Sequence, residues 1–183
     1  MVHGTQTHAA PSLGHFFVFD EDEWGVFPKK YPWLLGGDDR YNPIALKGAV
    51  EAIQRAVKSL QPVTVEVGRG MDGRVAFNRR FVMRDGTVRT HPPLCSPDIL
   101  HSEGPIDPEV GVMTFKAKDG RAIAAVLHHS CHPVHGYPLR WISAGWPGAW
   151  CDEVRIQLGR DCVTMVVNGF CGKDQYHRFL QQV

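Results

Sequence analysis

The sequence lacks the features that mark several classes of protein. Its longest apolar stretches, such as Ala122–Leu127, fall far short of the ~20 residues that span a bilayer, and no basic-then-apolar signal segment opens it. The 20 basic and 19 acidic residues are interspersed and give a formal net charge of +1. A nucleic-acid-binding protein usually carries a basic patch or stripe, which is missing here. We therefore expect no transmembrane segment and no nucleic-acid partner, and the cellular location stays open.

Recognisable cysteine and zinc motifs are missing as well. The chain has five cysteines, an odd number, and no two of them form a CxxC pair. Neither a disulfide framework nor a cysteine-based zinc knuckle is favoured. We expect most of these residues to be buried thiols that pack as small apolar side chains.

The residues that are present indicate one folded domain with two main helices. With 183 residues and 43% hydrophobic content, the chain is long enough to bury a core. Asn42-Pro43 begins a predicted helix over Asn42–Leu60, whose apolar residues recur at three- and four-residue steps and predict packing on a core. Pro147-Gly148 begins the second, over Pro147–Gly159, with Ala149, Val154 and Leu158 on one face.

Strands are predicted between and after these helices. Two hairpins are centred on the turn dipeptides Asp85-Gly86 and Asp119-Gly120. The proline-rich stretch from Thr90 to Pro108 is expected to be a covering loop. The order of elements predicts an α/β fold, a mixed sheet with a βαβ element and two main helices. The predicted strands are Val63–Val67, Phe81–Arg84, Thr87–Thr90, Val110–Ala117, Arg121–His129 and Cys162–Val167.

Four histidines follow one of these strands within eight residues: His128, His129, His132 and His135. Pro133 and Gly136 argue against a helix here, so the arrangement differs from the HExxH motif. A strand end that becomes a loop can hold zinc ligands, and a catalytic zinc takes about three from the protein. The alternative is that each is a hydrogen-bonded core histidine. His132 is the strongest candidate, because Pro133 restricts the residue before it to extended conformations.

A second candidate segment lies near the amino end, at Thr5-Gln6-Thr7-His8. On an extended backbone, Gln6 and His8 would point to the same side and could face one centre. The alternative is an ordinary surface strand with a chance histidine.

Six segments, taken in order, resemble the amino-terminal part of the neutral, non-lysosomal ceramidase family. That family has a Thr-His-Thr-His-Ser-x-Pro motif, an Asn-Arg stretch, an Asp-Pro-x-Val hairpin start, a metal-binding histidine after a strand, a Ser-Gly/Ala turn and a Gly-rich strand end. The matching positions are Thr5–Pro11, Asn78-Arg79, Asp107–Val110, His132, Ile142–Gly148 and Asn168–Gly172. The resemblance covers most of the chain, and it implies that the α/β fold is part of a larger catalytic domain.

The resemblance implies a zinc-dependent hydrolase of N-acyl amide bonds that acts on a lipid-like, ceramide-type substrate. In such enzymes the metal polarises a carbonyl and lowers the pKa of bound water. It implies that His132 is a zinc ligand, with Gln6 standing in a second ligand position. It also implies that His8 handles protons or orients the substrate, and that Arg79 faces the developing oxyanion. Family members are often exported.

Several departures from the family pattern lower the expected zinc affinity. Gln6 replaces a ligating histidine, and an amide oxygen is a weaker zinc ligand than imidazole. Lys173–Tyr176 stands where the family has a serine, and the remaining carboxylate and tyrosine ligands come from further along a longer chain. We therefore expect one ceramidase-like amino-terminal domain over residues 1–183, truncated at both ends, that binds zinc weakly and hydrolyses little or no ceramide alone.

Two alternatives remain at this point. One is a catalytically dead domain that binds a lipid or an amide. The other is an unrelated metal hydrolase that uses His129, His132 and His135.

Overall fold

The computed structural model describes residues 2–13, 37–93, 95–134, 141–172 and 174–176. The chain divides into two compact units. One unit combines Met1–Ala9 with Pro62–Val183, and the other is Ala10–Gln61.

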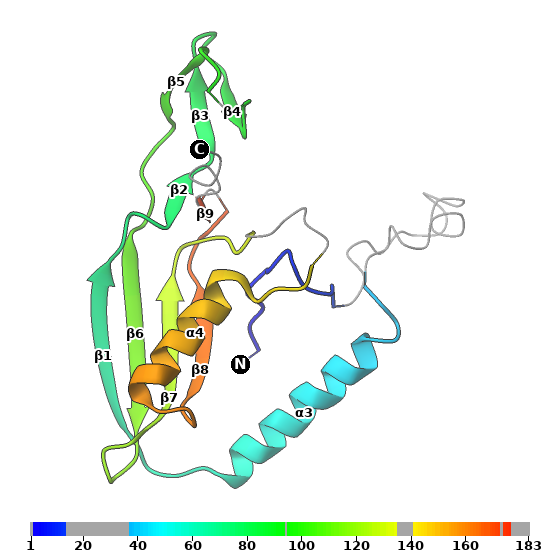
Figure 1. Cartoon of the computed structure of the whole chain (residues 1–183), viewed down its shortest axis with the longest axis vertical. Helices are drawn as coiled ribbons and strands as arrows, with labels where there is room; N and C mark the ends of the chain where they lie inside the picture. The colour runs from blue at the N-terminus through cyan, green and yellow to red at the C-terminus, as the bar shows by residue number, and fades with distance from the viewer. Residues whose placement is uncertain (1, 14–36, 94, 135–140, 173, 177–183) are drawn as a thin grey trace. The chain divides into compact units, whose positions relative to one another are not determined.

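The first unit is built on a four-stranded mixed sheet with the order β1-β6-β7-β8 (Figure 1). Its strands are β1 (Thr64–Met71), β6 (Glu109–Lys116), β7 (Ala122–His129) and β8 (Val163–Asn168). β6 pairs antiparallel with both β1 and β7. The tight Asp119-Gly120 turn joins β6 to β7 and requires the antiparallel pairing of these two strands. β8 pairs parallel to β7, from Ala124 opposite Val163 to His129 opposite Asn168.

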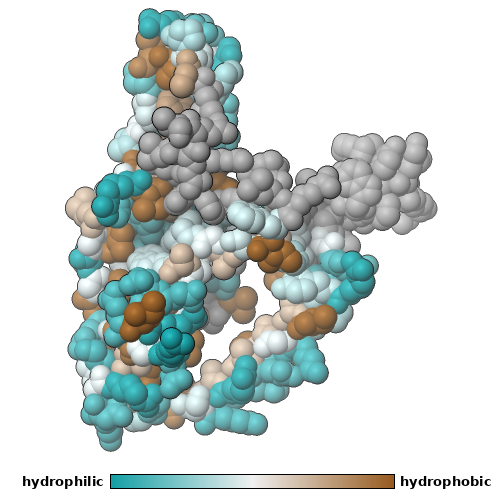
Figure 2. All heavy atoms as spheres, in the orientation of Figure 1, coloured by the Kyte–Doolittle hydropathy of each residue, from teal (hydrophilic) through white to brown (hydrophobic). Residues whose placement is uncertain are grey.

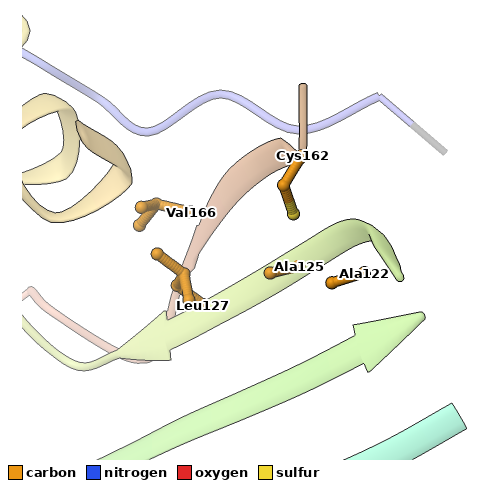
Figure 3. Close-up of a cluster of buried hydrophobic side chains, with 5 residues drawn as sticks. All are labelled: Ala122, Ala125, Leu127, Cys162 and Val166. Atoms are coloured by element: carbon orange, nitrogen blue, oxygen red, sulfur yellow. The ribbon is translucent and has the colours of Figure 1, made fainter. Parts of the chain in front are cut away.

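The helix α4 (Gly145–Leu158) connects β7 to β8 and packs on the sheet, so the predicted βαβ element is confirmed. The buried core under it consists of alanine and leucine side chains of β7, a valine of β8 and the cysteine just before β8 (Figure 3). Of the residues predicted on its inner face, Val154 and Leu158 pack on this core, while Ala149 is exposed. Trp146 and Trp150 pack against the core instead of Ala149, because their large rings reach the sheet. The core residues are Ala122, Ala125, Leu127, Cys162 and Val166.

The observed ends of α4 lie within two residues of the ends that the sequence predicts. The helix starts at Gly145 rather than at Pro147. It ends at Leu158, and Gly159 follows with a φ of 114°, a conformation that side chains disfavour and glycine accepts. The outward side of α4 is mostly hydrophilic in Figure 2, as an amphipathic helix on a sheet should be.

The second unit contains the helix α3 (Asn42–Lys58), with proline in its first turn as predicted. Asn42 is the first helical residue and not the cap, which is Tyr41, and no side chain caps the helix. Figure 2 colours one edge of α3 as hydrophobic and the other as hydrophilic. None of its residues is buried, so the structure does not show the core packing that its apolar face predicts.

Two smaller sheets complete the first unit. One has the order β4-β3-β5 and contains the predicted hairpin of β3 (Arg80–Met83) with β4 (Val88–Thr90). Its third strand, β5 (Ile99–Ser102), lies inside the stretch that was predicted to be only a loop. That prediction is wrong. A strand this short between prolines has too few residues to show the alternation of apolar and polar side chains that identifies a strand. The other sheet pairs β2 (Ala76–Asn78) with β9 (Asp174–Tyr176).

All five cysteines are free thiols, but only Cys131 and Cys162 are buried, so the expectation that most of them pack as buried side chains is wrong. Neither described helix has the length and apolar character that crossing a membrane would require.

Candidate functional site

The amino-terminal segment is held against the loop that follows β7. The backbone N–H of His8 donates to the carbonyl of Pro133 at 3.2 Å, and the carbonyl of Ala9 accepts from the N–H of Ser143 at 2.9 Å. The segment is therefore fixed between the histidine loop and the start of α4. The two bonds place His8 beside the end of the parallel strand pair.

The rings of His8 and His132 are in contact, although the residues are far apart in the sequence. Their centroids lie 4.7 Å apart, and the ring planes meet edge to face at 89°. The family resemblance assigns both residues to one site, and the contact agrees with that assignment. The backbone around His8 is a turn and not the extended strand that was considered from the sequence.

Gln6 departs from the extended backbone that would align it with His8. Its φ of 58° lies in the left-handed region, which breaks the alternation of sides on which that expectation depended. The residue is exposed. Its assignment as a metal ligand rests on the motif position alone and stays a prediction.

His132 is a buried imidazole with an unused nitrogen. The residue is 6% exposed, and its Nδ1 atom is buried without a hydrogen-bond partner among the described residues. Burial, followed by the charges of His8 and Arg79, lowers the pKa of His132 from its ordinary 6.5 to about 4. The ring is therefore neutral at pH 7, the form that can accept a proton or bind a metal.

Arg79 lies between β2 and β3 and is oriented by one carbonyl. Its Nε and Nη2 atoms donate to the Gly172 carbonyl at 3.0 and 2.6 Å. Its charge is one of the causes that lower the pKa of His132, after burial and the charge of His8. The next residue, Arg80, is instead paired with the Glu103 carboxylate at 2.5 and 2.8 Å.

The turn that leads from β7 to His132 is tied to the end of β8. The Asn168 side chain donates to the Cys131 carbonyl at 2.9 Å, and the N–H of Gly169 donates to the His129 carbonyl at 3.2 Å. The buried hydroxyl of Ser130 donates to the Asp107 carboxylate at 3.2 Å. Sequence analysis identified Asp107 and Asn168 only as motif positions, and it did not identify Ser130.

His129 makes its described contacts away from this pair. His129 Nδ1 bonds the Glu109 carbonyl at 3.1 Å, and the ring contacts Trp146. His135 lies outside the described residues. Among the described residues, no three His, Cys, Asp or Glu side chains converge on a point that could hold a metal ion. Since a catalytic zinc needs about three protein ligands, the described residues do not complete a zinc site.

Replacing Gly169 with alanine will destabilise the fold around the site. A Cβ at this position would overlap the Ser130 hydroxyl and lie 3.0 Å from His128 Nε2. Ser130 is buried and would lose its bond to Asp107 on moving, so we expect a loss of about 1–3 kcal/mol of unfolding free energy in urea titrations. Gly172→Ala is the matched control, because a Cβ there meets nothing within 4 Å. Equal stability of the two variants would contradict this packing.

The His132 ring will titrate near pH 4 in the folded chain, in NMR spectra of the histidine side chains. The folded pKa lies below the unfolded value of 6.5, so the unfolded state binds the proton more readily. The contribution of the neutral His132 ring to the free energy of unfolding is complete above pH 6.5 and is lost as the pH falls towards 4. His132→Gln will remove this part of the pH dependence of unfolding. A midpoint near 6.5 would show that the ring is not buried in solution.

No family model matches the chain. The chain is 27% identical over 136 residues to the neutral ceramidase of Pseudomonas aeruginosa, an alignment that covers 74% of this chain and 17% of that protein. The crystal structure of that neutral ceramidase shares its fold, with a TM-score of 0.58 at 23% identity over 81% of this chain and 23% of the other. A second solved structure, of a ceramidase complexed with C2, has a TM-score of 0.62 at 22% identity, over 93% of this chain and 24% of the other. The chain thus spans less than a quarter of the length of each relative, and it is similar in sequence and fold to one part of a ceramidase.

Proposed function

We propose that this domain is part of a ceramidase-like hydrolase of N-acyl amide bonds and that it recognises a lipid-like amide. The observation that carries the proposal is the contact between the His8 and His132 rings. It joins two segments that resemble separate motifs of one family, and one of the relatives is named neutral ceramidase. A ceramidase of similar fold has been solved in complex with C2, which supports an amide lipid as the substrate class.

The described side chains suit parts of amide hydrolysis. At pH 7 the neutral His132 ring offers a lone pair, and His8 beside it can take up or deliver a proton or orient the substrate. Arg79 supplies positive charge of the kind that stabilises an oxyanion as it forms. The Gly172 carbonyl holds this guanidinium in one orientation, so little reorganisation is needed when charge develops.

Zinc is proposed only as a weakly bound ion in this chain. His132 is the strongest ligand candidate, with its buried and unused Nδ1 atom, and Gln6 occupies the second motif position. Bound zinc would polarise the amide carbonyl. Because the described donors fall short of three, no step of the reaction is assigned to the metal here.

A short-chain ceramide will shift the His8 and His132 ring signals in NMR titrations, because the amide would bind against this pair. His101 is the internal control, since it lies on β5 and its Nδ1 atom is 2.8 Å from the Ser102 carbonyl. His132→Ala will weaken binding, and His101→Ala will not. Ceramide that shifts no histidine signal, or shifts all of them equally, would contradict an amide site at this place.

The isolated chain will bind zinc at well below one ion per molecule in elemental analysis and will hydrolyse little fluorescent short-chain ceramide. Ligand loss weakens zinc sites strongly, and even the loss of outer hydrogen-bond partners costs about 10–100-fold in affinity. The residual zinc and turnover will decrease in His132→Ala. Robust zinc-dependent turnover that His132→Ala abolishes would contradict this prediction. It would show that the chain supplies more zinc ligands than His132 and Gln6. Ceramide binding without any turnover would favour a binding domain.

A further inference from the structure

The turn between β7 and His132 consists of Ser130 and Cys131 alone. Both residues are buried, with exposed fractions of 1% and 0%. His132 comes next, with the centroid of its ring 4.7 Å from that of His8. Since each residue of so short a connection has only two soft backbone dihedral angles, the placement of Ser130 and Cys131 determines where the His132 ring stands.

The turn is held from both strands that flank β7 in the sheet, β6 and β8. On the β8 side, the Asn168 side chain donates to the Cys131 carbonyl at 2.9 Å. On the β6 side, the Ser130 hydroxyl donates to the Asp107 carboxylate at 3.2 Å. Asp107 lies just before β6, which begins at Glu109. The second bond is the one to which no role has been assigned so far.

The Asp107 carboxylate is itself oriented by the backbone. Its Oδ1 atom accepts the N–H of Glu109 at 3.0 Å, and its other oxygen, Oδ2, accepts the Ser130 hydroxyl. The Glu109 bond is the main cause that lowers the pKa of Asp107 below its ordinary value, and the Ser130 bond lowers it further. The carboxylate is therefore ionised at pH 7. Hydrogen bonds to an ionised acceptor are about twice as strong as bonds between neutral groups.

The packing around Ser130 leaves its hydroxyl little freedom. Gly169, just after β8, packs directly on this hydroxyl, so that a Cβ at Gly169 would overlap it. A buried hydroxyl without a partner is costly, so the bond to Asp107 is the favoured state of this side chain. Ser130 therefore links the backbone of the turn to a fixed point just before β6.

We propose that Ser130 and Asp107 are positioning residues, whose hydrogen bond holds the His132 ring edge to face against His8. They act through the backbone from Ser130 to His132. Their functional importance rests on the function proposed above, in which this pair of histidines binds the amide. A misplacement of about 1 Å in a catalytic site can cost on the order of 100-fold in rate, so the bond matters although neither residue is assigned a step of the reaction.

The first test follows two ring contacts by NMR in Ser130→Ala. We expect nuclear Overhauser cross peaks between the His8 and His132 rings in the unsubstituted chain, and their loss in Ser130→Ala. The cross peaks between His129 and Trp146, whose ring centroids lie 5.9 Å apart, should remain and show that α4 still packs on the sheet. Unchanged cross peaks between His8 and His132, or an equal loss of both ring contacts, would overturn the proposal.

Asp107→Ala provides a second variant from the other end of the bond, and it decides the question if Ser130→Ala does not fold. Asp107 is exposed, so its truncation leaves no buried cavity. The cross peaks between His8 and His132 should be lost in this variant as well. Their retention would overturn the proposal.

Two control variants remove similar hydrogen bonds elsewhere. Ser102→Ala removes the bond from an exposed serine hydroxyl to the Gly104 carbonyl, which is 3.1 Å long. Asp119→Ala matches Asp107→Ala, because Asp119 also accepts the N–H of the second residue after it, Arg121, at 3.0 Å. Asp119 lies beyond the other end of β6. Both controls should keep both ring contacts, and loss of the histidine contact in either of them would overturn the proposal.

Binding of a short-chain ceramide separates this inference from the proposed function. If the amide binds at the histidine pair, Ser130→Ala should weaken the affinity about tenfold, the effect of about one net hydrogen bond, and Ser102→Ala should not. An unsubstituted chain that binds no ceramide would overturn the proposed function, and the ring contacts alone would then decide the positioning role. Loss of the histidine contact with unchanged ceramide affinity would support the positioning role and overturn the amide site.

Discussion

The parallel pairing of β7 with β8 is the constraint on which the site depends. Parallel neighbours need a crossover connection, and α4 provides it, so the two strands end at the same edge of the sheet. His129 is opposite Asn168 at that edge, and the chain turns away from both strands just beyond this pair. The bonds of Asn168 and Gly169 to the turn then fix where His132 stands. The backbone bond from His8 to Pro133 then joins the amino-terminal segment to the loop that this pairing positions.

Much of the fold can be predicted from the sequence, because turns and helix ends are determined by a few neighbouring residues. The turn dipeptides Asp85-Gly86 and Asp119-Gly120 define both predicted hairpins, and Gly159 marks the end of a helix. β5 and the role of the two tryptophans in α4 were not predictable in this way. β5 is defined by pairing with a partner strand, and Trp146 and Trp150 pack on the sheet through ring size, which helical spacing does not encode.

The candidate site, too, was predicted from the sequence only in part. The motif order correctly brings His8 to His132, since the resemblance carries information about distant segments. It could not show the left-handed backbone of Gln6 or the burial of His129 against Trp146, because both depend on contacts made only in the folded chain. A pair of large aromatic residues four positions apart, at the start of the helix that follows a histidine-rich strand end, is a sequence signal that points to that contact.

The two neighbouring arginines after β2 show how one sequence dipeptide can give two different electrostatic elements. Arg80 shares its charge with the Glu103 carboxylate, so the pair is close to neutral and acts as a strut between two strand segments. Arg79 is oriented just as firmly, but by the carbonyl of Gly172, which carries no net charge. A carbonyl fixes the direction of a guanidinium without cancelling its field. Near the histidine pair the fold therefore keeps a stationary positive potential, to which an incoming anionic or polarised group would be drawn.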